Sequence, residues 1–92
     1  MPSAGSDTVS TEEVIYEDSV GCTTFRVHCQ TGSAVAAMVH VDGLHAASEF
    51  FTIPAGEAVE FTLNHMGIRK VTAKGNAGTA TINFGIVSRT MV

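Results

Sequence analysis

The stretch FFTIPAGEAVEFTL, residues 50–63, constrains the fold more than any other part of the sequence. After the turn at residues 54–57, the apolar Val59, Phe61 and Leu63 alternate with polar side chains. A period of two predicts a β-strand with one buried face, because an amphipathic helix would repeat every 3.6 residues. The Pro-Ala-Gly-Glu turn between two apolar runs predicts a hairpin or a corner between two sheets.

Similar short runs follow one another along most of the chain, and no segment shows a helical period. Turn residues separate them, and the expected strands cover residues 12–17, 23–29, 34–41, 49–53, 58–63, 68–74 and 79–88. About seven strands at this spacing predict an all-β fold, a single-domain antiparallel β-sandwich of jelly-roll or immunoglobulin-like topology. We expect this domain to span residues 12–92.

Two segments between the runs predict reversals of the chain. EDSVG, residues 17–21, contains polar residues and a glycine and predicts a turn after the first strand. GNAG, residues 75–78, predicts a hairpin turn, because Gly75 and Gly78 permit positive φ.

The first eleven residues are small or polar, with one proline and one valine among them. This composition predicts a flexible N-terminal arm over residues 1–11, which could become ordered against a neighbouring molecule. An extended arm of this kind can add a strand to another sheet and gain main-chain hydrogen bonds.

The balance of apolar and charged residues favours self-association. Of the 92 residues, 45% are hydrophobic and only 15% are charged, where soluble domains average about 25% charged. A domain this small cannot bury all of these apolar side chains in one core, so a second copy is the expected partner, in a dimer or trimer.

The charge and the N-terminus exclude several other partners. A net charge of −4 provides no basic stripe for nucleic acid and no attraction to an anionic membrane surface. The sequence has no run of 18 apolar residues, so it predicts no transmembrane helix, and the N-terminus does not resemble a signal peptide. We therefore expect synthesis in the cytoplasm, with export only inside a larger assembly.

The two cysteines, Cys22 and Cys29, are seven residues apart, which is not zinc-ligand spacing. A disulfide between them is possible if the strand folds back. In a reducing compartment we expect free and mostly buried thiols.

No pattern predicts catalytic, cofactor-binding or metal-binding residues, so the sequence indicates a protein that is not an enzyme. Cupin barrels bind metal through an HxH pair, a glutamate and a later histidine. Here Glu49 follows His45 at a suitable distance, but His40 and His45 are five residues apart and Val59 stands where the later histidine would be. No GxSxG motif is present, and GNAG precedes a strand rather than a helix.

Residues 52–87 resemble small structural proteins encoded by tailed bacteriophages. The shared features are the turn and strand in TIPAGEAVEFTL and the segment GIRKVTAKGNAGTATINFGIV. The resemblance implies a non-enzymatic capsid decoration (cement) protein. Such a protein binds a major capsid protein on the outside of the phage head, stabilises the shell, and is located on the virion surface. Two alternatives are a tail or head fibre subunit and a small carbohydrate-binding β-sandwich module. The second is weakened by the absence of Trp and the presence of one Tyr.

We expect the functional residues to form an interface with another molecule rather than a catalytic site. Residues 34–41 are apolar on both faces, so a second face is available for a neighbour. Phe50 and Phe51 are consecutive, so one of them must point away from the core unless the strand is bulged. The predicted interface comprises Val9, Glu12 and Glu13 from the arm, with Met38, His40, Phe50 and Phe51 from the domain.

Overall fold

The computed structural model describes residues 4–46, 48–63 and 67–88, and this part of the chain forms eight strands and no helix. None of the described residues therefore belongs to a helix that could cross a membrane. The strands are β1 (Ala4–Val9), β2 (Glu13–Cys22), β3 (Thr24–Cys29), β4 (Ala37–Val41), β5 (Phe51–Ile53), β6 (Ala58–Thr62), β7 (Ile68–Gly75) and β8 (Ala80–Ser88).

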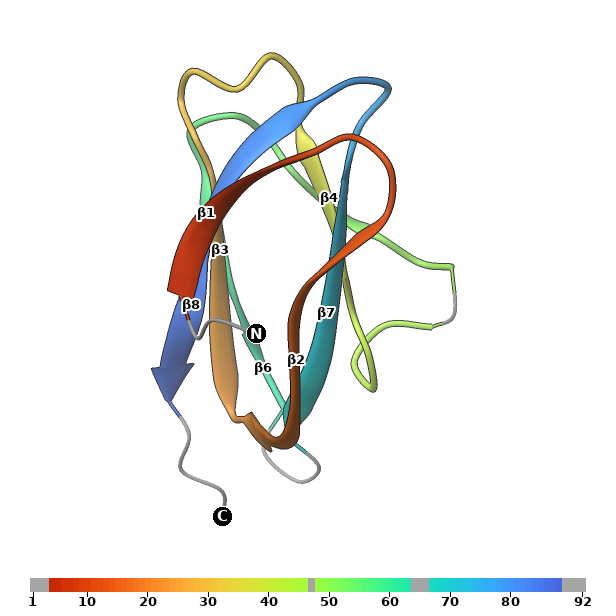
Figure 1. Cartoon of the computed structure of the whole chain (residues 1–92), viewed down its shortest axis with the longest axis vertical. Coiled ribbons are helices and arrows are strands. Elements are labelled where there is room, and N and C mark those ends of the chain that lie inside the picture. The colour runs from red at the N-terminus through yellow and green to blue at the C-terminus, as the bar shows by residue number, and fades with distance from the viewer. Residues whose placement is uncertain (1–3, 47, 64–66, 89–92) are drawn as a thin grey trace.

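The strands form two antiparallel four-stranded sheets that face each other (Figure 1). The first sheet has the order β1-β8-β3-β6 and the second β2-β7-β4-β5. The predicted β-sandwich is thus confirmed, and of the two topologies considered this order is that of a jelly roll. β1 pairs with β8, β2 with β7, β3 with β6 and β4 with β5. The fold is therefore one long antiparallel ribbon with its tip at β4–β5, rolled up so that β3 meets β8 and β4 meets β7.

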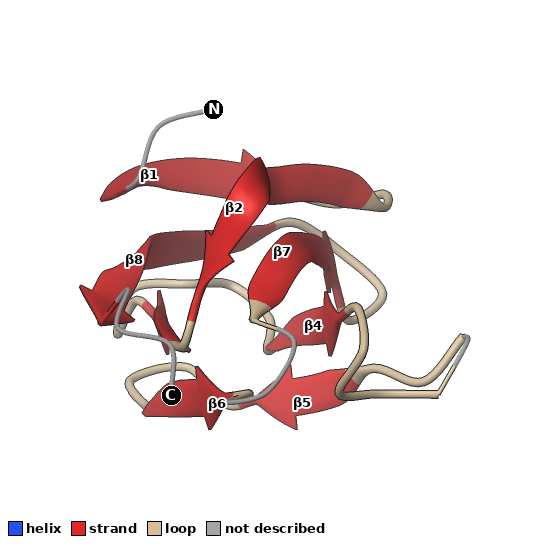
Figure 2. Ribbon diagram, turned by 90° about the horizontal axis from the view of Figure 1, so that it is seen from below, coloured by secondary structure: helices blue, strands red, loops and turns tan. Residues whose placement is uncertain are grey.

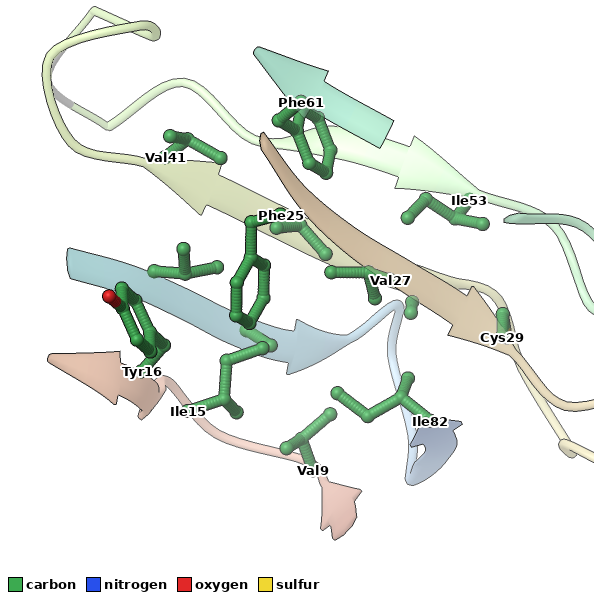
Figure 3. Packing of buried hydrophobic residues seen from close by; sticks show 14 of the residues in the cluster. Val9, Ile15, Tyr16, Phe25, Val27, Cys29, Val41, Ile53, Phe61 and Ile82 are labelled. Atoms are coloured by element: carbon green, nitrogen blue, oxygen red, sulfur yellow. The ribbon is translucent and has the colours of Figure 1, made fainter. Parts of the chain in front are cut away.

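The core lies between the two sheets and follows the alternation of the sequence. In β3, the side chains of Phe25, Val27 and Cys29 are fully buried, whereas Arg26 between them is exposed. Figure 3 shows Phe25 between the sheets, close to Tyr16 of β2, and their ring centroids are 4.9 Å apart. Burying such aromatic and branched side chains is the main stabilising contribution in a domain of this size.

The N-terminal segment differs from its prediction. Ala4–Val9 forms β1, which pairs with β8 from Ala4↔Gly85 to Val9↔Ala80, where the composition indicated a flexible arm. Val9 reaches the core and is only 1% exposed. β1 is therefore the additional strand that brings the predicted seven to eight. β1 has little apolar surface to bury, so the main-chain hydrogen bonds to β8 provide most of its attachment.

The two predicted reversals are also wrong. Residues 17–21 belong to β2, which continues to Cys22 through register shifts, with Gly21 at a φ of 83°. GNAG does not close a hairpin, because it leads from β7 in the second sheet to β8 in the first. A Cβ atom on Gly75 would lie 2.9 Å from the Val9 carbonyl oxygen and closer still to that of Gly78. Gly75 is thus required by close backbone packing, and Ala77 adopts the positive φ.

The Pro-Ala-Gly-Glu turn is a corner between sheets, the second of the two possibilities that the sequence left open. It connects β5 in the second sheet to β6 in the first. Gly56 has a φ of 88°, and its N–H donates to the Cys29 carbonyl oxygen at 2.8 Å. The corner thereby places β5 and β6 at the same side of the sandwich, opposite the side that carries β1 and β2 (Figure 2).

Candidate functional site: an aromatic and histidine cluster beside β5 and β6

The most distinctive surface feature is a group of rings at the side of the sandwich formed by β5 and β6. We call it the ring cluster, and it comprises His40 of β4, His45 of the following loop, Phe50, Phe51 of β5 and Phe61 of β6. Its rings come from both sheets, because the corner at residues 54–57 returns the chain to the first sheet beside β5.

Phe51 is the exposed member of the ring cluster. Its side chain is 44% exposed, although its ring packs edge-on against Phe61 at 5.8 Å between centroids and stacks with His45 at 6.4 Å. Leu44, in the same loop as His45, is 41% exposed. These side chains leave apolar surface next to two edge strands, which is a typical composition for the centre of a protein–protein contact.

His45 is fixed by the loop between β4 and β5. The Val41 N–H donates to His45 Nδ1 at 3.0 Å, so the neutral imidazole carries its proton on Nε2. Partial burial lowers the pKa of His45, and the neighbouring His40 acts in the same direction, while Glu49 opposes them. The position therefore favours a neutral ring that packs against Phe51 and Phe61.

His40 and Phe50 lie on the outer face of the second sheet. His40 Nδ1 is 2.7 Å from the carbonyl oxygen of Glu49, which only accepts, so the Nδ1–H must be the donor. The Phe50 ring packs against His40 at 5.7 Å on one side, and Lys74 Nζ lies 4.3 Å from its centroid. A cation over an aromatic face contributes about 0.5–1 kcal/mol at an exposed position, so Phe50 is held in place.

The predicted interface residues fall into three groups. Val9 is buried in the core of the single chain, so it could contact a partner only if β1 itself moved, and its place in an interface stays a prediction. Met38 and His40 are half-buried on the face of β4 opposite Val39, as alternation requires. Phe51, not Phe50, is the more exposed of the consecutive pair. Whether Met38, His40, Phe50 and Phe51 contact a partner stays a prediction.

Glu12 and Glu13 lie at the opposite side of the sandwich, away from the ring cluster. Glu12 is exposed in the connection between β1 and β2, and Glu13 begins β2. A hydrogen bond with Asp7 raises the pKa of Glu13, with smaller contributions from burial and from the Asp7 charge. Asp7 belongs to β1, so the two carboxyl groups meet between the two edge strands.

Neither the ring cluster nor the rest of the described surface contains a recognisable catalytic set. A shallow depression of about 200 Å³ is lined by Arg26, Asn83, Phe84, Gly85, Ile86 and Val87. Its one ionisable side chain is Arg26, so it provides no acid–base pair. Among the residues that the structure describes, no three His, Cys, Asp or Glu side chains are close enough to hold a metal ion.

Sequence reasoning missed His45 and Phe61 as members of the ring cluster, and it missed Lys74 as the cation over the Phe50 ring. The one usable signal was the two-residue alternation in Val59–Phe61, which places Phe61 inward, but only the corner at residues 54–57 brings it next to Phe51. No local pattern reports such a contact between sheets.

The cysteine prediction is confirmed. Neither Cys22 nor Cys29 is part of a disulfide, and both are fully buried. Cys22 ends β2 in the second sheet, and Cys29 ends β3 in the first, where its Sγ lies 3.7 Å from the Val35 carbonyl oxygen. Neither sulfur reaches the surface of the folded chain.

Comparison with known proteins gives a fold match and no family. No protein-family model and no curated protein sequence matches the chain. One solved structure resembles it with a TM-score of 0.52 and 20% sequence identity, over 92% of this chain and 84% of the other. That structure comes from work describing Bacillus endospore appendages as a novel family of disulfide-linked pili. At this identity the likeness establishes a shared fold.

This match corrects the resemblance to bacteriophage proteins. The chain matches, along nearly its whole length, an appendage subunit and not a capsid protein. The prediction of a capsid decoration protein is therefore wrong, together with the virion location and the major capsid protein as partner. The motifs in residues 52–87 that suggested it are turn and strand motifs, which any sandwich with the same corner would share. Of the alternatives, a fibre subunit agrees best with the match.

Proposed function

We propose that the chain is a non-enzymatic structural subunit that assembles with copies of itself into an extended, appendage-like fibre. The observation that carries this proposal is the exposed apolar surface around Phe51, located beside the edge strands β5 and β6. The fold likeness to a pilus-forming protein supports it, since that protein too uses a β-sandwich as a building block. Many identical weak contacts then add up to a stable fibre.

The way in which the rings are held also supports a role in assembly. His45 and Phe61 support Phe51 from two sides, so little side-chain entropy remains to be lost when a partner covers it. A supported aromatic side chain with a large exposed area is the kind of residue that dominates binding energy in protein interfaces.

The test compares the full chain with Phe51→Ser by light scattering and negative-stain electron microscopy over increasing concentration. We expect fibres from the unmodified chain and at least a tenfold higher critical concentration for Phe51→Ser, because the exposed ring is lost. Val87→Ser is the matched control, since Val87 is 52% exposed but lies on β8, outside the ring cluster.

Thermal unfolding of both variants separates loss of assembly from loss of folding. A chain that stays monomeric at all concentrations would overturn the fibre proposal. Fibres that form equally well from Phe51→Ser, while Val87→Ser fails, would place the contact on another surface.

A further inference from the structure

β1 is an edge strand with few apolar contacts to the core. It forms the open end of the rolled ribbon and is paired on one side only, with β8. Its residues are small or polar. Of those whose burial is described, residues 5–9, Val9 is the one in the core, while Gly5, Ser6 and Thr8 are exposed. Its attachment therefore consists mainly of main-chain hydrogen bonds, which an identical strand can provide equally well.

The connection after β1 is short and passes between the two sheets. Residues 10–12 are exposed and lead from Val9 in the first sheet to Glu13 in the second. The Gly75 N–H holds this connection by donating to the Ser10 carbonyl oxygen at 3.2 Å. Three residues span roughly 10 Å when extended, so straightening the connection carries β1 away from its own sheet. Short connections of this kind favour exchange of the element that they join.

Two carboxyl groups face each other across this connection. Asp7 of β1 lies within hydrogen-bonding reach of Glu13 of β2, and the pKa of Glu13 is raised mainly by that hydrogen bond. Asp7 is the one charged group that acts on Glu13. When both groups are ionised at neutral pH they repel each other, and this repulsion disappears when β1 leaves its place. The same contact reforms when an identical strand docks, so the repulsion accelerates release without favouring either end state.

We propose that β1 is exchanged between copies of this chain, each copy placing its β1 on the β8 edge of the next. This inference rests on the proposed fibre function and adds a second contact between subunits, at the side of the sandwich opposite the ring cluster. A second copy is the occupant because it alone carries the strand whose register with β8 is already established over six residue pairs. Each copy donates one strand and accepts one, so the contact is head-to-tail and continues into an open fibre when the rotation does not close a ring.

Thr8 and Thr81 provide the means to test the exchange. They are register partners, and both the Thr81 N–H and its carbonyl oxygen bond away from β1, to Ser33 Oγ and the Gln30 N–H. They therefore form a non-hydrogen-bonded pair with Cα atoms about 4.5 Å apart, within the range that a disulfide spans. Cysteines at these positions link whichever β1 occupies β8.

The experiment mixes Thr8→Cys and Thr81→Cys chains in equal amounts under conditions in which the unmodified chain assembles, followed by mild oxidation. We expect Thr8→Cys to be linked to Thr81→Cys in about half of the Thr81→Cys chains, because neighbours pair at random. Peptide mass spectrometry identifies this link and distinguishes it from collisions between like chains. Cys22 and Cys29 are buried and do not compete.

Thr24→Cys and Thr62→Cys form the matched control. Their parent hydroxyl oxygens are 3.3 Å apart in the β3–β6 pair, which is not exchanged in the proposal. The double variant should form this link within one chain, and a mixture of the single variants should not form it. Fibres without the link between Thr8→Cys and Thr81→Cys, or with equal linkage in the control mixture, would overturn strand exchange alone. Absence of any assembly by the unmodified chain would overturn the fibre function and this inference together.

Discussion

At the scale of single residues, the hydrogen bond that raises the pKa of Glu13 makes stability depend on pH. The pKa of Glu13 is raised in the fold, so its stabilising contribution is complete below the ordinary value of 4.5 and is lost as the pH rises through the folded value. We expect Asp7→Asn to remove this loss and to stabilise the protein at pH 7 by about 0.5 kcal/mol or less, since solvent screens exposed pairs. Urea denaturation at pH 4 and pH 7 measures the change.

The asparagine retains the Oδ1 atom that accepts from the Thr8 N–H at 2.8 Å, so the local turn is preserved. Glu12→Gln removes a neighbouring exposed carboxylate without touching the pair, and it should leave the pH dependence as it is in the unmodified chain. A pH dependence that is the same in Asp7→Asn and in the unmodified chain would show that Asp7 does not raise the pKa of Glu13.

His45 makes stability depend on pH in the opposite sense to Glu13. Its pKa is lowered from 6.5, chiefly by burial, so its contribution to stability is present above this value and is lost as the pH falls through the folded value. Protonation of Nδ1 would also break the hydrogen bond from the Val41 N–H. We expect His45→Ala to lose about 1–2 kcal/mol at pH 8, where the N–H loses its acceptor, and less at pH 5.

Chemical denaturation at the two pH values measures this difference, and His28→Ala provides the control. His28 is half-buried on β3 in the first sheet and is not part of the ring cluster. An equal loss for His45→Ala at pH 5 and pH 8 would contradict a neutral, hydrogen-bonded ring.

At the scale of elements, Val9 holds β1 to the core. Replacing this fully buried side chain by alanine leaves a small cavity and should cost about 1–3 kcal/mol. Because Val9 is the main apolar anchor of β1, the loss should appear as faster amide hydrogen exchange in β1 and β8 before the other strands are affected. Thr8→Ala, at the exposed neighbouring position, is the control and should change stability by less than about 0.5 kcal/mol.

The elements that the sequence predicts well are those with one buried face. β3, β6, β7 and β8 lie within two residues of the expected runs, because alternation reports burial directly. β1 escaped prediction because AGSDTV contains a single large apolar residue, and its pairing partner β8 is more than 70 residues away. The continuation of β2 through EDSVG escaped because its pairing with β7 tolerates register shifts and a glycine at positive φ, neither of which has a local signature.

The ring cluster was predictable only in part. One of the two consecutive phenylalanines must point away from the core, and that one is Phe50, which packs with His40 and Lys74 on the outer face. Phe51 pairs with the buried Val39 and shares its inner face, yet it is 44% exposed because it lies on an edge strand. The residues that pack against Phe51 depend on the corner at residues 54–57, which takes the chain from the second sheet to the first. The sequence was equally compatible with a hairpin at this position. Contacts between sheets are determined by the rolled topology, and composition carries no record of them.

At the scale of the whole molecule, the chain differs in one respect from what is stated of the pili that it resembles. Those pili are described as disulfide-linked. This sequence contains two cysteines, and both are fully buried with no disulfide between them. We therefore expect fibres of this protein to keep their length in excess dithiothreitol, and the subunits to run as monomers on a non-reducing denaturing gel.

Electron microscopy and sedimentation before and after reduction measure this property. Ser6→Cys, which places a thiol at an exposed position of β1, provides a positive control for reactivity towards iodoacetamide. Fibres that dissolve in reductant, or a covalent ladder from the unmodified chain, would show that the cysteines become exposed during assembly.

The burial of one thiol in each sheet also has a consequence for time-resolved measurements. A thiol reagent can modify Cys22 only when the end of β2 separates from the second sheet, and Cys29 only when the end of β3 is uncovered in the first. The two modification rates therefore report separately how often each half of the sandwich opens. Equal rates would indicate that the halves open together in one cooperative event, and a faster Cys22 would indicate that the β2 edge opens by itself.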